Sequence, residues 1–256
     1  MKNPYDELYK QVDMEETPFG HSKDYFMWRT AQLKGGLSRF INKDGLVLDV
    51  GGGFGIMEKF LPYFVDAETN YINTDISSTM LKLKRGQNVL SAAEYLPFID
   101  NSADYIVISE VLEHVTDKTV ALEKCYSVLK SGGLLLLTTP RTGWIEDYKK
   151  SPFVMFLSAA SLINRLVSKL TVRSLFVPKG DLDVVVPEGI IDEPSDELWL
   201  AHTLEKVGFR VITQYRADKH VPWDKNGESK LWRLFSDLLI NSKKFGHCTV
   251  VVCLKP

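Results

Sequence analysis

The stretch LDVGGGFG, residues 48–55, constrains the fold more than any other part of the chain. Its apolar first half predicts a buried strand, and the glycines that follow predict a tight turn opening a helix near Ile56. Such a turn brings backbone N–H groups and the positive end of a helix toward a ligand. Gly51, Gly53 and Gly55 permit positive φ angles and close approach. The stretch therefore predicts a ligand site at the end of a strand, although plain tight turns also use glycine.

Short apolar runs alternate with helical patterns along much of the 256-residue chain. Apolar strands separated by helices indicate an α/β fold with a mostly parallel sheet covered on both faces. The expected strands are residues 46–50, 70–75, 88–90, 105–109, 134–139, 209–216 and 248–254. The expected helices are 56–61, 78–85, one from about Glu110, 118–129, 153–170, one after an N-cap at Ser195, and 228–244.

The alternation breaks after Pro140, and this break sets the expected organisation. Residues 1–45 should form an N-terminal helical cap, and residues 46–140 with 195–256 the core. Residues 141–194 should form a helical insert within the same domain, acting as a substrate lid. Its amphipathic helix 153–170 could pack as a cap, line an acceptor pocket, contact a second subunit, or rest on a membrane that presents a lipid-linked acceptor. The oligomeric state stays open.

Composition narrows the classes of partner and compartment. The net charge of −2 gives no reason to expect nucleic acid as a partner. Three cysteines, odd in number and without zinc-type spacing, indicate reduced thiols and a cytoplasmic location. The charged N-terminus does not resemble a signal peptide, and no apolar run reaches the ~18 residues of a membrane span.

Asp75 ends the second expected strand, 20 positions after Gly55. A carboxylate at this place can bind a ribose diol with both oxygens, although it could simply mark a helix entry. The bulky Ile56 stands where a dinucleotide-binding motif packs Gly or Ala. These two features favour a nucleoside ligand other than a dinucleotide.

The segment SEVLEH, residues 109–114, contains two carboxylates and an imidazole. On a helix, Glu110, Glu113 and His114 would fall at i, i+3 and i+4 and share one face. Three interpretations compete: the floor of a cofactor pocket, a general base at His114, and a divalent-metal site. An imidazole has a suitable unperturbed pKa near 6.5 for the second. We expect the pocket floor, with His114 as the candidate base and no metal.

Four stretches in order resemble the class I S-adenosylmethionine-dependent methyltransferases. They are LDVGGGFG, TDISSTML (74–81), AAEYLPFIDNSADYIVISEVLEHV (92–115) and LKSGGLLLLTTP (129–140). The resemblance is to the small-molecule (type 11-like) branch, typified by quinone, sugar and lipid O- and C-methyltransferases. It implies a Rossmann-like, doubly wound sheet of seven strands with an antiparallel last strand. It also implies S-adenosylmethionine as the cofactor and S-adenosylhomocysteine as its product.

The resemblance also assigns roles to residues. Asp49, Gly51, Gly52, Gly53 and Gly55 would line the methionine and ribose moieties. Asp75 and the adjacent Ile76, with Ala93, Glu94, Ser109 and Glu110, complete the expected cofactor site, from the ribose and adenine to the sulfonium end. Ala92 stands where the family often has an Asp that binds the adenine amine, which puts one hydrogen bond in doubt.

The expected activity is methyl transfer to a small-molecule acceptor, at a hydroxyl of a sugar-, quinone- or lipid-like compound. One alternative is a metal-dependent RNA 2′-O-methyltransferase, because Glu110, Glu113 and His114 resemble the metal ligands of such enzymes. These enzymes need a further His, for which His202 is the candidate. The other alternative is a catalytically silent cofactor-binding domain. Fold analogy alone does not identify the acceptor.

Overall fold

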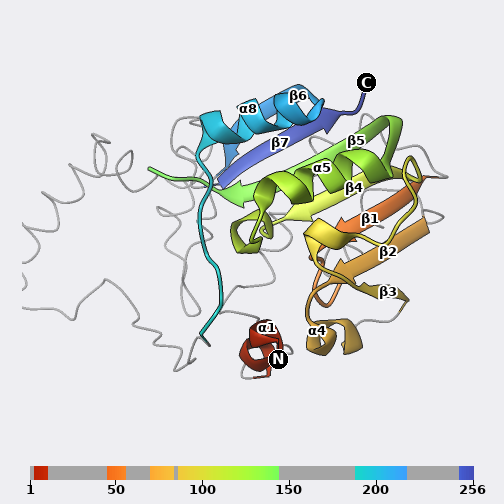
Figure 1. Cartoon of the computed structure of the whole chain (residues 1–256), viewed down its shortest axis with the longest axis vertical. Helices are drawn as coiled ribbons and strands as arrows, with labels where there is room; N and C mark the ends of the chain where they lie inside the picture. The colour runs from red at the N-terminus through yellow and green to blue at the C-terminus, as the bar shows by residue number, and fades with distance from the viewer. Residues whose placement is uncertain (1–2, 11–44, 56–69, 84–85, 144–187, 218–247) are drawn as a thin grey trace, which may run out of the picture. The chain divides into compact units, whose positions relative to one another are not determined.

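The computed structural model describes residues 3–10, 45–55, 70–83, 86–143, 188–217 and 248–256, coloured in Figure 1. The expected helices at 56–61, 153–170 and 228–244 lie outside these residues. The chain divides into two compact units, one of Met1–Thr142 with Val184–Pro256 and one of Gly143–Asp183. The described residues lie in the first unit apart from Gly143, so the insert's role as a lid stays a prediction.

One seven-stranded sheet forms the centre of this unit, in the order β3-β2-β1-β4-β5-β7-β6. The strands are β1 (Leu46–Val50), β2 (Asn70–Asp75), β3 (Gln87–Leu90), β4 (Ala103–Ser109), β5 (Leu129–Pro140), β6 (Arg210–Ala217) and β7 (Cys248–Leu254). β1 to β5 pair in parallel, whereas β7 runs antiparallel to both of its neighbours. The predicted fold class, with its antiparallel last strand, is confirmed.

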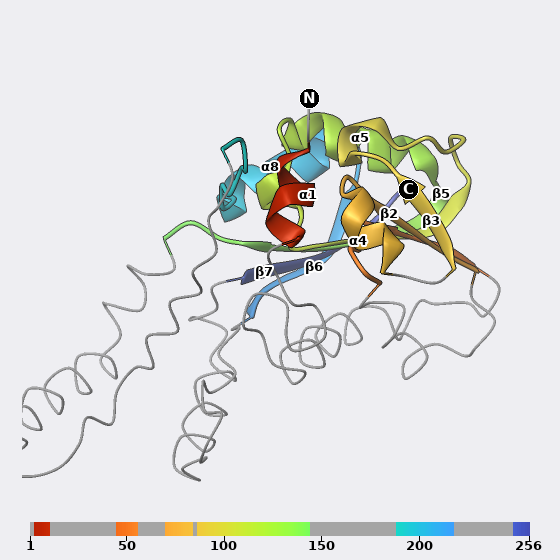
Figure 2. The ribbon, with the colours of Figure 1, turned by 90° about the horizontal axis from the view of Figure 1, so that it is seen from below.

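The strands bury both of their faces, which explains why they are apolar along most of their length. Leu48 and Val50 of β1 belong to one core cluster, and Val47 belongs to another on the opposite face. Two helices, α5 (Lys118–Val128) and α8 (Glu197–Val207), pack on the first face, and Figure 2 shows them on the same side of the sheet.

The helix ends depart from the expected pattern in two places. α8 begins after Asp196, whose carboxylate accepts from the N–H groups of Leu198 and Trp199, so the N-cap is Asp196 and the prediction of Ser195 was wrong. α5 ends at Val128, one residue before its expected end, and β5 already begins at Leu129, whereas the expected strand begins at residue 134. The ammonium of Lys255 lies at this helix end and donates to the carbonyls of Tyr126 and Leu129, both at 2.7 Å.

Two short helices lie near the β2–β3 edge of the sheet. α4 spans Ser78–Lys82 and is capped by Ser77. α1 spans Pro4–Tyr9 within the expected N-terminal cap. In the described part of the chain, no helix has the length and apolar character needed to cross a membrane.

The strand order identifies where a ligand should bind. The chain proceeds from β1 outward to β2 and β3, and then returns to place β4 on the other side of β1. The order therefore reverses between β1 and β4, and ligands of open α/β sheets bind at the carboxyl ends of the strands at such a point. The glycine turn follows β1 and Glu110 follows β4, so the sequence motifs meet at this reversal.

Candidate cofactor and active site

The glycine turn after β1 has the backbone that its sequence predicts. Gly51, Gly53 and Gly55 have φ angles of +69°, +57° and +79°, in the left-handed region that favours glycine. At Gly52 the constraint is space: an added Cβ would lie 2.1 Å from Asn73 Oδ1 and 2.3 Å from Asp49 Oδ2. The turn therefore excludes side chains at these positions.

Three backbone amides of this turn bind within the protein. The N–H of Gly52 donates to the carbonyl of Thr74 at 3.0 Å, and that of Gly55 to the carbonyl of Gly52 at 2.9 Å. The N–H of Gly53 donates to the carboxylate of Asp75 at 2.9 Å. These hydrogen bonds fix the turn against β2, and the glycines leave a surface without side chains for close approach. The three N–H groups were expected to face a ligand, but they bind protein oxygens instead.

Asp75 connects the glycine turn to the start of α4. Its Oδ2 accepts from Gly53, and its Oδ1 accepts from the N–H of Ser77 at 2.7 Å. Burial raises the pKa of this carboxyl group, while the two amide hydrogen bonds act in the opposite direction. Each carboxylate oxygen has two acceptor positions, so these bonds still leave acceptor capacity for a ribose diol.

A polar row lies beneath the turn, on three adjacent strands. Asp49, Asn73 and Asn88 are in register across β1, β2 and β3. Asp49 is 1% exposed and accepts from the hydroxyl of Tyr71, while the Asn73 amide donates to the carbonyl of Gly53 at 2.8 Å. Asp49 therefore supports the turn from below. Among the described residues, Asn73 Oδ1 is the buried side-chain oxygen that lacks a hydrogen-bond partner.

The prediction of a helix from Glu110 was wrong, and no common face of carboxylates and imidazole forms. Glu110 has a left-handed φ of +57°, which is incompatible with an α-helix at this residue. A single 3₁₀ turn, η4, follows over Leu112–His114. The Glu110 carboxylate lies beside Cys248 Sγ, at 3.5 Å and 3.7 Å from its two oxygens. Below it, the Ser109 hydroxyl is hydrogen-bonded to Thr138 at 2.9 Å.

Glu113 and His114 point to other partners. Glu113 is 2% exposed and accepts from the Thr139 hydroxyl at 3.1 Å. His114 Nδ1 lies 2.5 Å from the carbonyl oxygen of Ile191, and its Nε2 lies 4.0 Å from a Glu113 oxygen. Glu113 and His114 thus stay close to each other while Glu110 faces Cys248, and among the described residues no group of three His, Cys, Asp or Glu side chains could hold a metal ion.

α1 contacts both sides of this site. The Asp6 carboxylate accepts from the N–H of Thr79 at 2.8 Å and from the Ser77 hydroxyl at 2.6 Å. Burial alone would raise the pKa of Asp6, but the hydrogen bonds from Ser77, Thr79 and Ser78 outweigh it and lower that pKa. The Tyr5 hydroxyl donates to the carbonyl of His114 at 3.2 Å. α1 therefore connects the end of β2 to η4.

The sequence is similar to those of known methyltransferases. Residues 48–137 match the family model described as "Methyltransferase domain". The ubiquinone/menaquinone biosynthesis C-methyltransferase UbiE of Klebsiella pneumoniae subsp. pneumoniae is 30% identical over 186 residues, 68% of this chain and 70% of that protein. The chain belongs to the class I S-adenosylmethionine-dependent methyltransferases. The prediction of an enzyme that uses S-adenosylmethionine is confirmed.

Solved structures show the same methyltransferase fold. A possible histamine N-methyltransferase from Thermotoga maritima aligns with a TM-score of 0.53 at 17% identity, covering 91% of each chain. Phosphoethanolamine N-methyltransferase 2 of Haemonchus contortus, in complex with S-adenosylmethionine, aligns with a TM-score of 0.54 at 15% identity, covering 91% of this chain and 56% of that one. At such identities the likeness concerns the fold.

The residues of this methyltransferase fit its cofactor. The bare glycine surface allows close approach, and the carboxylate of Asp75 at the end of β2 is an acceptor suited to ribose hydroxyls. Beside it, Ile76 is 44% exposed and offers apolar surface to a planar ring. Ala93 is buried at the start of the 3₁₀ turn η3 (Ala93–Tyr95). The sequence-predicted residues of β1 and β2 thus gather at one edge.

Glu94 of the methyltransferase has a structural partner that its sequence did not indicate. Its carboxylate accepts from the N–H groups of Thr116 and Asp117, at 3.1 Å and 3.3 Å. These amides precede α5, so Glu94 fixes the entry to that helix. Its expected place in the cofactor site stays a prediction.

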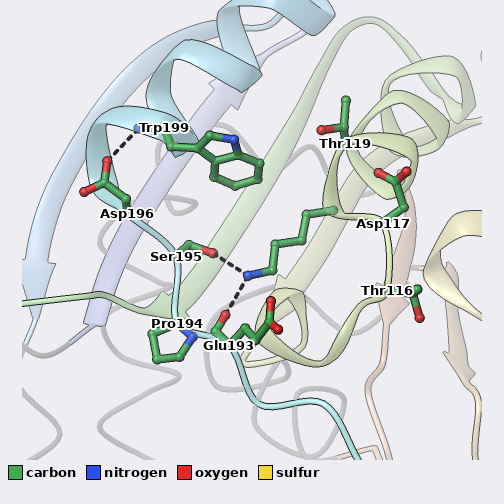
Figure 3. A pocket seen from close by; sticks show the side chains of 9 residues that line it. Thr116, Asp117, Thr119, Glu193, Pro194, Ser195, Asp196 and Trp199 are labelled. Atoms are coloured by element: carbon green, nitrogen blue, oxygen red, sulfur yellow. Dashed lines mark hydrogen bonds between the residues drawn. The ribbon is translucent and has the colours of Figure 1, made fainter.

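A pocket of about 420 Å³ lies away from the glycine turn, between the starts of α5 and α8 (Figure 3). Lys118 donates to the carbonyl of Glu193 at 2.6 Å, and Trp199 faces the same space. The pocket is wide open and mostly polar. The glycine turn and Asp75 lie elsewhere, at the β1–β4 reversal.

Three residues of the site were not predicted from the sequence: Asn73, Asn3 and Asp6. Asn73 could have been found, because an Asn in the middle of a buried strand needs a polar partner. Asn3 donates to the carbonyl of Ile76, and Asp6 binds the start of α4. Nothing in the local pattern around these two residues indicates a partner more than 70 positions away.

Proposed function

We propose that this methyltransferase transfers a methyl group from S-adenosylmethionine to a small hydroxylated acceptor of the quinol type. The observation that supports the donor site is the glycine turn held against Asp75 at the β1–β4 reversal. The acceptor class is suggested by the Klebsiella relative, which is named a ubiquinone/menaquinone C-methyltransferase. The match covers 70% of that protein, so its substrate comes to this chain only as a proposal.

On this proposal, the donor lies along the carboxyl ends of β1, β2 and β4. Asp75 accepts hydrogen bonds from the ribose hydroxyls, and the glycines let the backbone approach the methionine moiety. Ile76 and Ala93 pack against the adenine, and Asp49 positions the turn from below. The bound donor supplies an electrophilic methyl group on a sulfonium. The protein's own task is alignment of the acceptor and exclusion of water.

The acceptor hydroxyl needs to lose its proton as the methyl group is transferred. An ionised ring hydroxyl is nucleophilic at its oxygen and also at the neighbouring ring carbon. Transfer to oxygen is the expectation from sequence, and transfer to carbon is what the relative's name would suggest. The identity of the methylated atom in the product distinguishes the two.

His114 remains the proposed base, and its surroundings suit that role. A carbonyl oxygen can only accept, so contact with Ile191 assigns the hydrogen to Nδ1 and leaves Nε2 as the basic atom. The buried carboxylate of Glu113, 4.0 Å from Nε2, would stabilise the imidazolium that forms. Proton transfer of this kind contributes about 10²–10⁴-fold to rate.

The test is incubation of the purified protein with methyl-labelled S-adenosylmethionine and naphthalene-1,4-diol under reducing conditions. We expect label in an organic product and stoichiometric S-adenosylhomocysteine, with mass spectrometry and NMR locating the methyl group. The variant His114→Gln should lower kcat by at least about tenfold with little change in donor affinity. Donor binding without turnover of this diol or related quinols would refute the acceptor class.

The metal-dependent RNA alternative gains no support from the geometry. Glu110, Glu113 and His114 face Cys248, Thr139 and Ile191 respectively, and would need to be rearranged to share one ion. Activity that survives EDTA would exclude that alternative directly.

A further inference from the structure

Residues 191–195, just before α8, are bound to η4 and to the end of β5 through alternate residues. The N–H of Glu193 donates to the carbonyl of Glu113 at 2.9 Å. Two residues farther on, the N–H of Ser195 donates to the carbonyl of Pro140 at 3.0 Å. Bonds from alternate residues place one edge of this stretch against its neighbours, as along a strand. The stretch is therefore held in register beside η4.

The first residue of this stretch, Ile191, contacts His114 in two ways. Its carbonyl oxygen lies 2.5 Å from Nδ1 of the imidazole. Its N–H donates to the Tyr5 hydroxyl at 3.4 Å, and that hydroxyl donates to the carbonyl of His114 at 3.2 Å. The three residues thus form a closed ring of hydrogen bonds. In this ring, the Tyr5 hydroxyl joins the backbone of Ile191 to the backbone of His114.

The imidazole of His114 depends on this ring for its state, because packing encloses it only in part. The His114 side chain is 35% exposed, and the Tyr5 ring meets it edge-on with the ring centroids 6.2 Å apart. A neutral imidazole carries its hydrogen on either nitrogen, and the partner of one nitrogen decides which. The position of the Ile191 carbonyl therefore determines the tautomer of His114.

Tyr5 has the properties needed to hold that carbonyl in place. Burial raises the pKa of Tyr5, and nearby carboxylates act in the same direction, whereas the N–H of Ile191 acts against them. The hydroxyl therefore keeps the proton that it donates to His114. The position of Tyr5 is set by α1, which is anchored at the start of α4 through the Asp6 carboxylate.

We infer that Tyr5 is a positioning residue of this methyltransferase: its hydroxyl holds Ile191 beside η4, and the Ile191 carbonyl then keeps the hydrogen of His114 on Nδ1. This inference rests on the proposed function, in which the hydrogen-free Nε2 accepts the proton of the substrate hydroxyl. The state of the proposed base is thus controlled by a residue 109 positions earlier in the chain.

The tautomer of His114 is measured by ¹⁵N NMR at alkaline pH on protein labelled in its five histidines. The variant His114→Gln identifies the resonances of residue 114. In wild type we expect the hydrogen on Nδ1. In Tyr5→Phe, the ratio of Nδ1–H to Nε2–H should fall about three- to tenfold, as for loss of one neutral hydrogen bond. Tyr126→Phe, the same change at the far end of α5, is the control and should leave the ratio unchanged. An unchanged ratio in Tyr5→Phe, or hydrogen on Nε2 in wild type, would overturn the inference.

Kinetics with naphthalene-1,4-diol tests whether Tyr5 acts through His114. Tyr5→Phe should lower kcat about three- to tenfold, with the Kd of S-adenosylhomocysteine within about threefold of wild type. In a His114→Gln background, Tyr5→Phe should lower kcat no further, because the imidazole through which it acts is gone. Loss of kcat by the same factor in both backgrounds would assign the hydroxyl a merely structural role and overturn the positioning role.

Lys118 provides a second variant that loosens the same stretch without touching α1. Its ammonium donates to the carbonyl of Glu193 at 2.6 Å, two residues beyond Ile191. Lys118→Met should therefore shift the His114 tautomer in the same direction as Tyr5→Phe. Lys124→Met, on the same helix but paired with Asp100, is the control and should not shift it. If Tyr5→Phe does not fold, an unchanged tautomer in Lys118→Met overturns the inference.

Failure of the proposed function is distinguishable from failure of this inference. If the wild-type protein binds S-adenosylhomocysteine but does not methylate the diol, the acceptor class proposed above fails. The NMR measurement needs no substrate, so it still decides the role of Tyr5: a fall in the ratio supports it, and an unchanged ratio overturns it.

Discussion

The substitution Gly52→Ala tests the glycine turn most sharply, because it adds a single methyl group. The new Cβ would lie 2.1 Å from Asn73 Oδ1 and 2.3 Å from Asp49 Oδ2, against 3.4–4 Å for ordinary van der Waals contact. Neither oxygen can easily withdraw, because both side chains are at most 1% exposed. Asp49 is held by Tyr71. The turn itself therefore has to move by about 1 Å.

The expected cost follows from that displacement. Inserting a methyl group into a packed site typically costs about 1–3 kcal/mol, which corresponds to a fall in melting temperature of roughly 2–10 °C for a chain of this size. A shift of about 1 Å at a positioning element can cost 10²-fold in rate. We therefore expect Gly52→Ala to weaken S-adenosylhomocysteine binding by at least about tenfold, measured by calorimetry on folded protein.

Gly132→Ala is the control for a glycine-to-alanine change that lowers stability away from the turn. Gly132 has a φ of +80°, yet an added Cβ there would meet nothing within 4 Å. Left-handed strain of about 1–2 kcal/mol should lower the melting temperature of this variant without affecting the ligand. Wild-type affinity in Gly52→Ala, or equal loss of affinity in both variants, would show that the close packing beneath the turn does not define the donor site.

Two further predictions concern carboxylates around the donor. Asp75→Ala should weaken S-adenosylhomocysteine binding by about 10²-fold or more, because it removes the acceptor for the ribose and also the bond that holds Gly53; unchanged affinity in calorimetry would refute this site. Hydrogen bonds from Ser77 and Thr79 lower the pKa of Asp6. They therefore stabilise the folded protein at pH values above the ordinary carboxyl pKa of about 4, and this stabilisation is lost as the pH falls through the lowered pKa. Urea unfolding should therefore show wild type more stable than Asp6→Asn at pH 7, with a difference that shrinks below pH ~4, and a difference independent of pH would contradict the assignment.

The features of the fold that were predicted correctly from the sequence are those set by neighbouring residues in the chain. A buried strand, a glycine turn and a carboxylate 20 positions later are all set by short-range chemistry, and Gly51, Gly53 and Asp75 are found where this chemistry requires them. The α/β class follows from the alternation of apolar strands and helices, because parallel strands need a crossover between them.

The segment SEVLEH shows where local reasoning fails. Its spacing fits one face of a helix, but the backbone at Glu110 is left-handed and only one 3₁₀ turn follows. The reason lies outside the segment: β5 binds the N–H of Glu110, β7 supplies Cys248, and the stretch before α8 supplies the carbonyl that His114 contacts. Partners 77 or 138 positions away leave no periodic signal in the six residues themselves.

The strand order places two groups of side chains on opposite sides of the reversal between β1 and β4. The glycine turn and Asp75 follow β1 and end β2, on one side of the reversal, and the N–H of Gly53 donates to the Asp75 carboxylate. Glu110 and Cys248 come from the ends of β4 and β7, on the other side. Substitutions at distant sites usually have additive effects on stability. The double variant Asp75→Ala/Cys248→Ala should therefore show the sum of the two single changes in the free energy of unfolding, measured by urea titration, and strong non-additivity would show that the two sides of the reversal are energetically coupled.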